Sequence, residues 1–203
     1  FVVKPTYDPL KDFAPTSLVS ITPMVLVTHP SLPVKTAQEF IALARAKPGA
    51  VLMASAGTGS NTHLTGELFQ AITGVKLTHV PYKGAGPALV DLMGGQIQFL
   101  FPSIPAAVQH IRSGKLAALG VTTAERATAL PEVATIAEAG LPGYEASSWF
   151  GMHAPAKTPK DIVHKLNAAI VNVDTAVRTI ESPVPKPYSH EPPHLMPAGS
   201  EST

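Results

Sequence analysis

Four short apolar runs recur along the chain, at residues 51–56, 77–81, 97–101 and 116–122. Each run is too short and too unbroken for an amphipathic helix, and such runs are typical of strands that are covered on both faces. Between them, apolar residues recur at three- and four-residue spacing, which is typical of helices that pack on a sheet. These helices are expected over residues 60–73, 87–93 and 105–113. The alternation predicts a parallel α/β fold with ligand loops at the carboxyl ends of the strands.

The flanking segments carry weaker patterns. Residues 1–15 contain three prolines and predict an irregular connector, and residues 17–28 look strand-like apart from Pro23. Capping boxes predict a helix from Thr36 and a very short one from Thr135, and residues 147–155 form an extended run. Another helix is expected from Thr158, with an inward face formed by Ile162, Val163, Leu166 and Ile170.

Composition limits the classes of function. The chain has 203 residues, of which 45% are hydrophobic and 14% charged, so it can bury a core. Its net charge of +1 and the lack of a basic run argue against a nucleic-acid partner. The absence of cysteine excludes disulfides. No apolar run reaches the length of a membrane span, so direct membrane insertion is not expected, and no signal peptide is visible at Phe1.

The turn after the first apolar run is the strongest candidate site. A strand ending at Ser55 is followed by two glycines and by Ser60, a good N-cap for the next helix. A glycine turn at a helix start presents backbone N–H groups and the positive end of the helix dipole, which suits a carboxylate or phosphate. The candidate residues are Ser55, Ala56, Gly57, Thr58, Gly59 and Ser60. The alternative is that the turn only closes the chain and solvates the helix end.

Known fingerprints do not fit this turn. A dinucleotide motif would need glycine where Thr62 stands, and a nucleophile elbow around Ser55 would need glycine at Met53. None of the eight histidines forms a metal-binding pair on one helical face, so no metal site is predicted. Neither paired carboxylates nor a cofactor fingerprint stands out, so no cofactor is expected and binding is favoured over catalysis.

Four further side chains are weighed as parts of a site. His63 follows the glycine turn, where it could orient a ligand or help to cap the helix. Lys83, in a second glycine loop, could meet an anion or remain solvated. Tyr82 and Trp149 could stack on a ligand, although aromatic residues at strand ends more often cover a core.

Four ordered segments resemble one family. They read ASAGTGSNTHLTGELF, HVPYKGAGPAL, LPEVATIAEAGLPGY and SSWFGMHAPAKTP, and they are similar to segments of the Bug-type substrate-binding proteins of tripartite tricarboxylate transporters. The resemblance covers residues 1–172. It implies a periplasmic receptor that binds small carboxylates, without catalysis or metal, for the membrane subunits of its transporter.

The resemblance also implies an architecture, the type II (Venus-flytrap) periplasmic-binding-protein fold. One lobe would be nearly complete and the other partial. Residues 1–27 would hold part of the first lobe and a crossover strand, and residues 28–146 the second lobe. Residues 147–180 would hold the return crossover and a helix of the first lobe. Apart from the resemblance, the many prolines over residues 181–203 predict a disordered tail.

Site residues follow from the same resemblance. Residues 55–60 with His63 match the carboxylate-gripping loop, Tyr82, Lys83 and Gly84 match a second wall of the cleft, and Ser103 matches a third. The sequence departs from the family where the first strand should precede Phe1, where the tail replaces the end of the first lobe, and at Pro102, where many members carry an acidic residue.

Two rival functions stay open beside the receptor. One is a serine hydrolase that uses Ser55 or Ser60, although a base with an orienting partner is not evident in the sequence. The other is a remnant that folds without binding.

Overall fold

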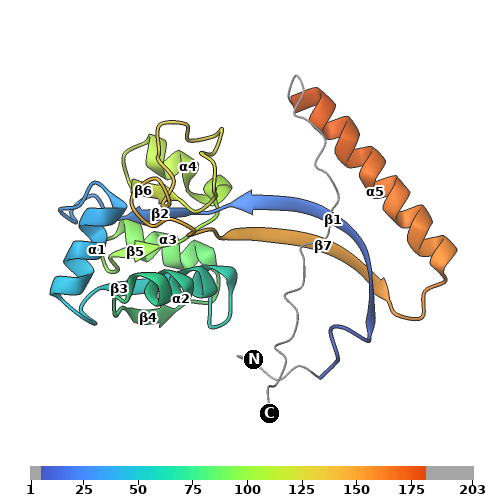
Figure 1. Ribbon diagram of the computed structural model, residues 1–203, viewed down its shortest axis with the longest axis horizontal. Helices are drawn as coiled ribbons and strands as arrows, with labels where there is room; N and C mark the ends of the chain where they lie inside the picture. Colours follow the sequence, from blue (N-terminus) through green and yellow to red (C-terminus); the bar gives the residue numbers. More distant parts are fainter. Residues whose placement is uncertain (1–5, 182–203) are drawn as a thin grey trace, which may run out of the picture.

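The computed structural model describes residues 6–181 and shows a body of one sheet with helices on it, from which a long arm extends (Figure 1). The predicted disordered tail covers residues 181–203; Glu181 is instead the last residue of a helix, and residues 182–203 lie outside the described residues. The strands are β1 (Phe13–Pro23), β2 (Val25–Thr28), β3 (Leu52–Ser55), β4 (Thr78–Pro81), β5 (Phe99–Leu100), β6 (Ala117–Val121) and β7 (Ser147–Pro155). The helices are α1 (Ala37–Ala46), α2 (Asn61–Thr73), α3 (Ala85–Met93), α4 (Ile104–Arg112) and α5 (Lys160–Glu181).

The body is built on a five-stranded sheet with the order β4-β3-β5-β2-β6. Strand β3 pairs in parallel with β4 and β5, as the alternation of strands and helices predicts. Strand β2, from the segment expected as a crossover, lies between β5 and β6 and is antiparallel to both, so β6 runs in the same direction as β5 and β3. The predicted parallel arrangement of the four apolar runs is thus confirmed, and β2 is the one strand of this sheet that runs in the opposite direction.

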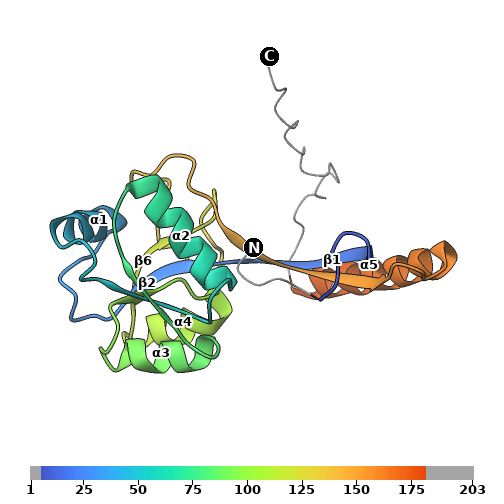
Figure 2. The same cartoon turned by 90° about the horizontal axis from the view of Figure 1, so that it is seen from below.

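Helices cover both faces of this sheet, with α1 and α2 on one side and α3 and α4 on the other (Figure 2). The first face packs around Phe40, Phe69 and Phe99. The second packs around Leu89, Leu92 and Leu100. Burial on both faces explains why the strands read as continuous apolar runs in the sequence.

Helix α2 buries a different face from the one its large apolar residues mark. Of the apolar positions at helical spacing, Phe69 is fully buried, whereas Leu64, Leu68 and Ile72 are exposed. The buried face is formed mostly by small residues, because α2 lies very close to β3. A Cβ atom at Gly66 would stand only 2.0 Å from the sulfur atom of Met53, so a larger residue there would have to displace the buried Met53 side chain.

The expected short helix from Thr135 is a turn in the structure. Its capping box does form: the Thr135 N–H donates to Glu138 Oε2 at 2.8 Å, and the Glu138 N–H donates to Thr135 Oγ1 at 2.9 Å. Gly140, which has a φ of 99°, then ends the turn before a helix can continue.

The arm is a two-stranded antiparallel ribbon of β1 and β7, followed by α5 (Figure 1). Strand β1 already begins at Phe13, within the segment predicted to be irregular, and it ends at Pro23, so the expected strand over residues 17–28 is two strands. Thr122 joins the two strands at the base of the arm, since its hydroxyl accepts from the Met24 N–H at 3.2 Å and donates to the Ala146 carbonyl at 2.6 Å.

Helix α5 does not have the buried face that its sequence predicts. Ile162 and Leu166 are 40% and 44% exposed, and its contact with the arm includes a hydrogen bond of 2.7 Å from Asn167 Nδ2 to the Thr16 carbonyl. In the part of the chain that the structure describes, no helix has the length and apolarity needed to cross a membrane.

Candidate functional site

The candidate loop begins at the carboxyl end of β3 and ends at the start of α2. Gly57 and Gly59 have φ angles of 131° and 81°, which residues with a side chain rarely adopt. A Cβ atom at Gly57 would also stand 3.3 Å from the Tyr82 carbonyl oxygen. The two glycines therefore allow a tight turn that lies against the second glycine loop.

Ser60 is the N-cap of α2, as predicted. Its hydroxyl accepts from the His63 N–H at 3.4 Å and donates to the Gly57 carbonyl at 2.6 Å. The hydroxyl of Thr62 lies 2.9 Å from that of Ser60 and accepts from the Ala56 N–H at 2.8 Å. Because the Ser60 hydrogen is engaged with Gly57, this side chain builds the loop rather than offering a donor to a ligand.

Several backbone donors of the loop are already satisfied. The N–H groups of Gly57, Gly59 and Ser60 donate to Ser55 Oγ, His63 Nδ1 and the Gly57 carbonyl, each at 3.1 Å. Among the described contacts, no acceptor is found for the N–H groups of Thr58, Asn61 and Thr62. The last two belong to the first turn of α2, where N–H groups have no partner within the helix.

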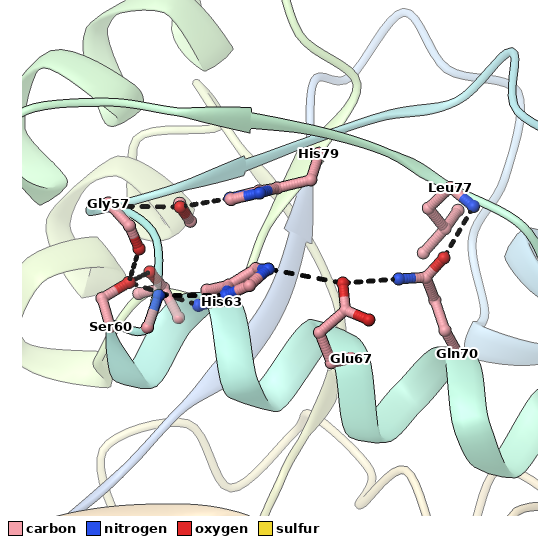
Figure 3. A network of polar contacts seen from close by, with 10 residues as sticks. Gly57, Ser60, His63, Glu67, Gln70, Leu77 and His79 are labelled. Carbon is pink, nitrogen blue, oxygen red and sulfur yellow. Dashed lines mark hydrogen bonds and ion pairs between the residues drawn. The ribbon is translucent and has the colours of Figure 1, made fainter. Parts of the chain in front are cut away.

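A line of polar side chains runs from the loop along α2 (Figure 3). His79 Nε2 lies 2.6 Å from Ser55 Oγ, and the rings of His79 and His63 stack at a centroid distance of 3.9 Å. His63 Nε2 lies 3.4 Å from Glu67 Oε1, which accepts from Gln70 Nε2 at 2.9 Å. Burial, together with the neighbouring His63, lowers the pKa of His79, and Glu67 opposes this shift.

The second glycine loop lies directly against the first. The N–H groups of Tyr82 and Gly84 donate to the Ser55 and Ala56 carbonyls at 3.0 and 3.1 Å. The Tyr82 hydroxyl donates to Asp91 Oδ2 at 2.7 Å, and burial with this bond raises the pKa of Tyr82 to about 12. The Tyr82 side chain therefore fastens the loop to α3, while Lys83 is exposed.

Ser103 and Trp149 belong to other elements than the two glycine loops. Ser103 follows β5, next to β3 in the sheet, and it is the N-cap of α4 without a side-chain capping bond. Trp149 is 62% exposed on β7, where its ring lies near Gly151. The link between β7 and the loop is made by its neighbour Ser148, whose hydroxyl accepts from Asn61 Nδ2 at 2.5 Å.

Sequence reasoning did not include Asn61, Thr62, Glu67 and His79 in the site. The capping motif of α2 could have indicated Thr62, because hydroxyls in the first helical turn often bond to the backbone. His79 could not be placed without the register of β3 and β4, which sets Met53 opposite His79 and so brings the imidazole near Ser55.

The pair of Ser55 and His79 has the distance of a nucleophile and a base, but its surroundings do not suit hydrolysis. Ser55 is fully buried, so a substrate carbonyl has no access to its hydroxyl. Glu67, the carboxylate of this network, contacts His63 rather than His79. An activated serine needs an accessible hydroxyl and normally a base oriented by a third group. Within residues 6–181, no three histidine, aspartate or glutamate side chains form a group that could hold a metal.

Comparison with known proteins places this architecture among periplasmic binding proteins of the TctC and Bug type. Residues 1–182 match the model of the tripartite tricarboxylate transporter family receptor, and the chain belongs to that family. BugT from Bordetella pertussis is 44% identical over 164 residues, which are 81% of this chain and 50% of BugT. The chain thus spans about half the length of the curated relatives that it matches.

Two solved structures from Rhodopseudomonas palustris are similar to the chain. One, solved with adipate, is 41% identical with a TM-score of 0.76, and the match covers 81% of this chain and 55% of the other. The second, MatC with bound malate, is 37% identical with a TM-score of 0.77, and the match covers 86% of this chain and 60% of MatC.

Proposed function

We propose that the chain provides the carboxylate-binding part of a periplasmic solute receptor, with the ligand held at the start of α2. The observation that carries this proposal is the set of unpaired N–H groups at Thr58, Asn61 and Thr62, beside the glycine turn. A helix start offers such donors together with the positive end of the helix dipole, and hydrogen bonds to a charged acceptor are the strong ones. The loop is preorganised, because its other donors and hydroxyls bond to one another.

The relatives support a dicarboxylate as the ligand. Adipate and malate are the small molecules named with the two similar structures, and both carry two carboxylates. One carboxylate would bind at the loop of residues 55–60, and the wall formed by Tyr82, Lys83 and Gly84 would lie beside it. Membrane subunits of a tripartite tricarboxylate transporter would be the protein partner, and catalysis is not part of this function.

The proposal includes a division of the chain. Residues 28–146 would form a lobe that contains the sheet and the loop, while residues 1–27 and 147–180 would belong to the other lobe through the arm. The bonds of Thr122 to Met24 and Ala146 support this boundary, because they tie together the two points where the arm leaves the sheet.

The Ser60→Ala variant tests the loop. Loss of the cap should lower the free energy of unfolding by about 0.5–2 kcal/mol. If adipate binding has to supply this free energy to order the turn, the affinity for adipate should fall by about two- to thirtyfold. Amide shifts in an NMR titration with adipate would measure the change. The matched control is Ser113→Ala. Ser113 is an exposed serine at the carboxyl end of α4, and its replacement should leave the affinity for adipate unchanged. Equal affinities of the Ser60→Ala variant and the parent chain would contradict a role for the loop.

A second prediction concerns ligands with an ammonium group. Pro102 lies buried at the end of β5 beside Phe101, so this wall offers no carboxylate to pair with an ammonium. An unpaired ammonium would lose hydration without compensation. Malate or adipate should therefore stabilise the protein more than glutamate or aspartate does in a thermal-shift series at equal concentrations. Stronger stabilisation by either amino acid would refute the prediction.

A further inference from the structure

The candidate loop rests on a stacked pair of histidines from two elements. His63 lies in the first turn of α2 and His79 lies on β4, with ring centroids 3.9 Å apart and ring planes inclined by 21° (Figure 3). One ring bonds to Gly59 and the other to Ser55, so the pair holds the turn at both ends.

The bond to Gly59 fixes the protonation state of His63. Its Nδ1 accepts the Gly59 N–H at 3.1 Å, so in this arrangement the ring is neutral and carries its proton on Nε2, facing Glu67 Oε1 at 3.4 Å. If Nδ1 also carried a proton, it would be a donor facing the Gly59 N–H, which is itself a donor, and no hydrogen bond could form between them. Protonated His63 therefore cannot keep its bond to the loop.

The contact of His79 is less demanding. Its Nε2 lies 2.6 Å from Ser55 Oγ, and a hydroxyl can either donate to this nitrogen or accept from it. Ser55 Oγ also accepts from the Gly57 N–H, so the ring supports the start of the turn through one side chain. Burial and the neighbouring ring lower the pKa of His79, so its surroundings favour the neutral ring.

The charges around the pair come from one helix. Glu67 is the charged side chain of α2 that faces the rings, while β3 contributes the uncharged Ser55 and β4 contributes no titratable group besides His79. Glu67 interacts with both the charged and the neutral form of His63, because Nε2 carries a proton in each. Glu67 therefore does not provide the Gly59 N–H with a new acceptor when His63 Nδ1 is protonated.

We propose that His63 and His79 are positioning residues for the carboxylate loop, and that a proton on His63 releases Gly59, opens the turn and weakens ligand capture. The effect on ligand capture rests on the proposed function, whereas the support of the turn by the two histidines does not. Neutral imidazoles hold the turn closed and ready for a carboxylate.

Amide hydrogen exchange of the unliganded chain tests the positioning without any ligand. Exchange is measured at a neutral and at an acidic pH, and is corrected for its intrinsic pH dependence. Protection of the Gly59 amide should drop by about fivefold at the lower pH, the change expected for one lost hydrogen bond. The Gly49 amide, which donates to the Lys76 carbonyl at 2.8 Å in a turn without an imidazole, is the internal control and should not change.

The decisive variant is His63→Asn. The amide oxygen of asparagine can take the place of Nδ1 as acceptor from Gly59, and it does not titrate. Gly59 should stay protected at both pH values in this variant, whereas a His63→Leu variant should lose that protection at both. A pH-dependent loss that persists in His63→Asn, or no pH dependence in the parent chain, would overturn the proposal.

Adipate then separates the two proposals. Its affinity should fall at the lower pH in the parent chain more than in His63→Asn, and the variant accounts for protonation of the ligand itself. Equal falls in both proteins would overturn the regulatory part. If Gly59 behaves as expected but adipate binds at neither pH, the proposed function fails while the positioning role stands.

Discussion

The Phe69→Ala variant is expected to lose about 3–5 kcal/mol of unfolding free energy, because a large buried ring is removed from a close-packed core. Phe69 is completely buried and joins α2 to three other aromatic rings. Its ring centroid lies 6.0 Å from Phe40, 5.7 Å from Phe101 and 6.0 Å from Tyr144. These partners come from α1, the end of β5 and the segment before β7, so the surrounding structure cannot readily collapse into the cavity.

Leu68→Ala is the matched control, since it truncates the neighbouring residue of the same helix. Leu68 is 38% exposed, so its truncation should lower the unfolding free energy by less than about 1.5 kcal/mol, which is below the value for a fully buried leucine. Urea unfolding followed by circular dichroism measures both variants. Losses of similar size would mean that α2 packs on the sheet by a different face.

Hydrogen exchange is expected to divide the chain into a protected body and a weakly protected arm. The arm exposes large apolar side chains, with Leu18, Trp149 and Phe150 at 55%, 62% and 55%. Each apolar side chain of this size would contribute about 1.5–3 kcal/mol if it were fully buried, and that stabilisation is missing here. Amides of β3, β4, β5 and β6 should therefore exchange more than about a hundredfold more slowly than those of α5 from Asp161 onward.

Mass-spectrometric exchange on the monomer, with sedimentation to check for association, measures this contrast. Association through the exposed apolar faces of the arm should appear as the concentration rises. Uniform protection from β3 to the end of α5 in a monomer would show that the arm is as well supported as the body. Such a result would also remove the reason for regarding the chain as a binding-incompetent remnant.

The sheet was predictable from the sequence where burial alone determined the pattern. The runs that begin near residues 51, 77, 97 and 116 became β3, β4, β5 and β6, because strands covered on both faces are apolar throughout. The direction of β2 was not predictable in this way, since an apolar run has the same composition whether its neighbours are parallel or antiparallel.

The inward face of α2 shows a second limit of sequence reasoning. Helical spacing marks Leu64 and Leu68, yet the helix turns Thr65 and Gly66 toward the sheet. The close approach of Gly66 to Met53 decides this, and it depends on the distance between the helix and β3 rather than on hydrophobicity. Large side chains on that face would force the helix away from the strand.

The candidate site was predictable to the extent that it is local. A strand end, two glycines and a serine N-cap define the loop, and all of them are adjacent in the sequence. The support of the loop by His79 and its link to Ser148 join residues 24 and 87 positions apart, so only the tertiary structure shows them. The sequence also does not show how many N–H groups of the loop are already hydrogen-bonded, because this depends on side-chain acceptors such as His63 Nδ1.

A titration of the isotopically labelled chain with adipate, followed by amide NMR, tests the central claim most directly because it detects even weak binding. The account predicts that the largest shifts occur at the amides of Thr58, Asn61 and Thr62, for which no acceptor is found among the described residues. Amides of β6, on the opposite edge of the sheet, should shift far less. The absence of shifts at the three loop amides up to millimolar adipate, or larger shifts elsewhere in the body, would contradict carboxylate binding at the start of α2.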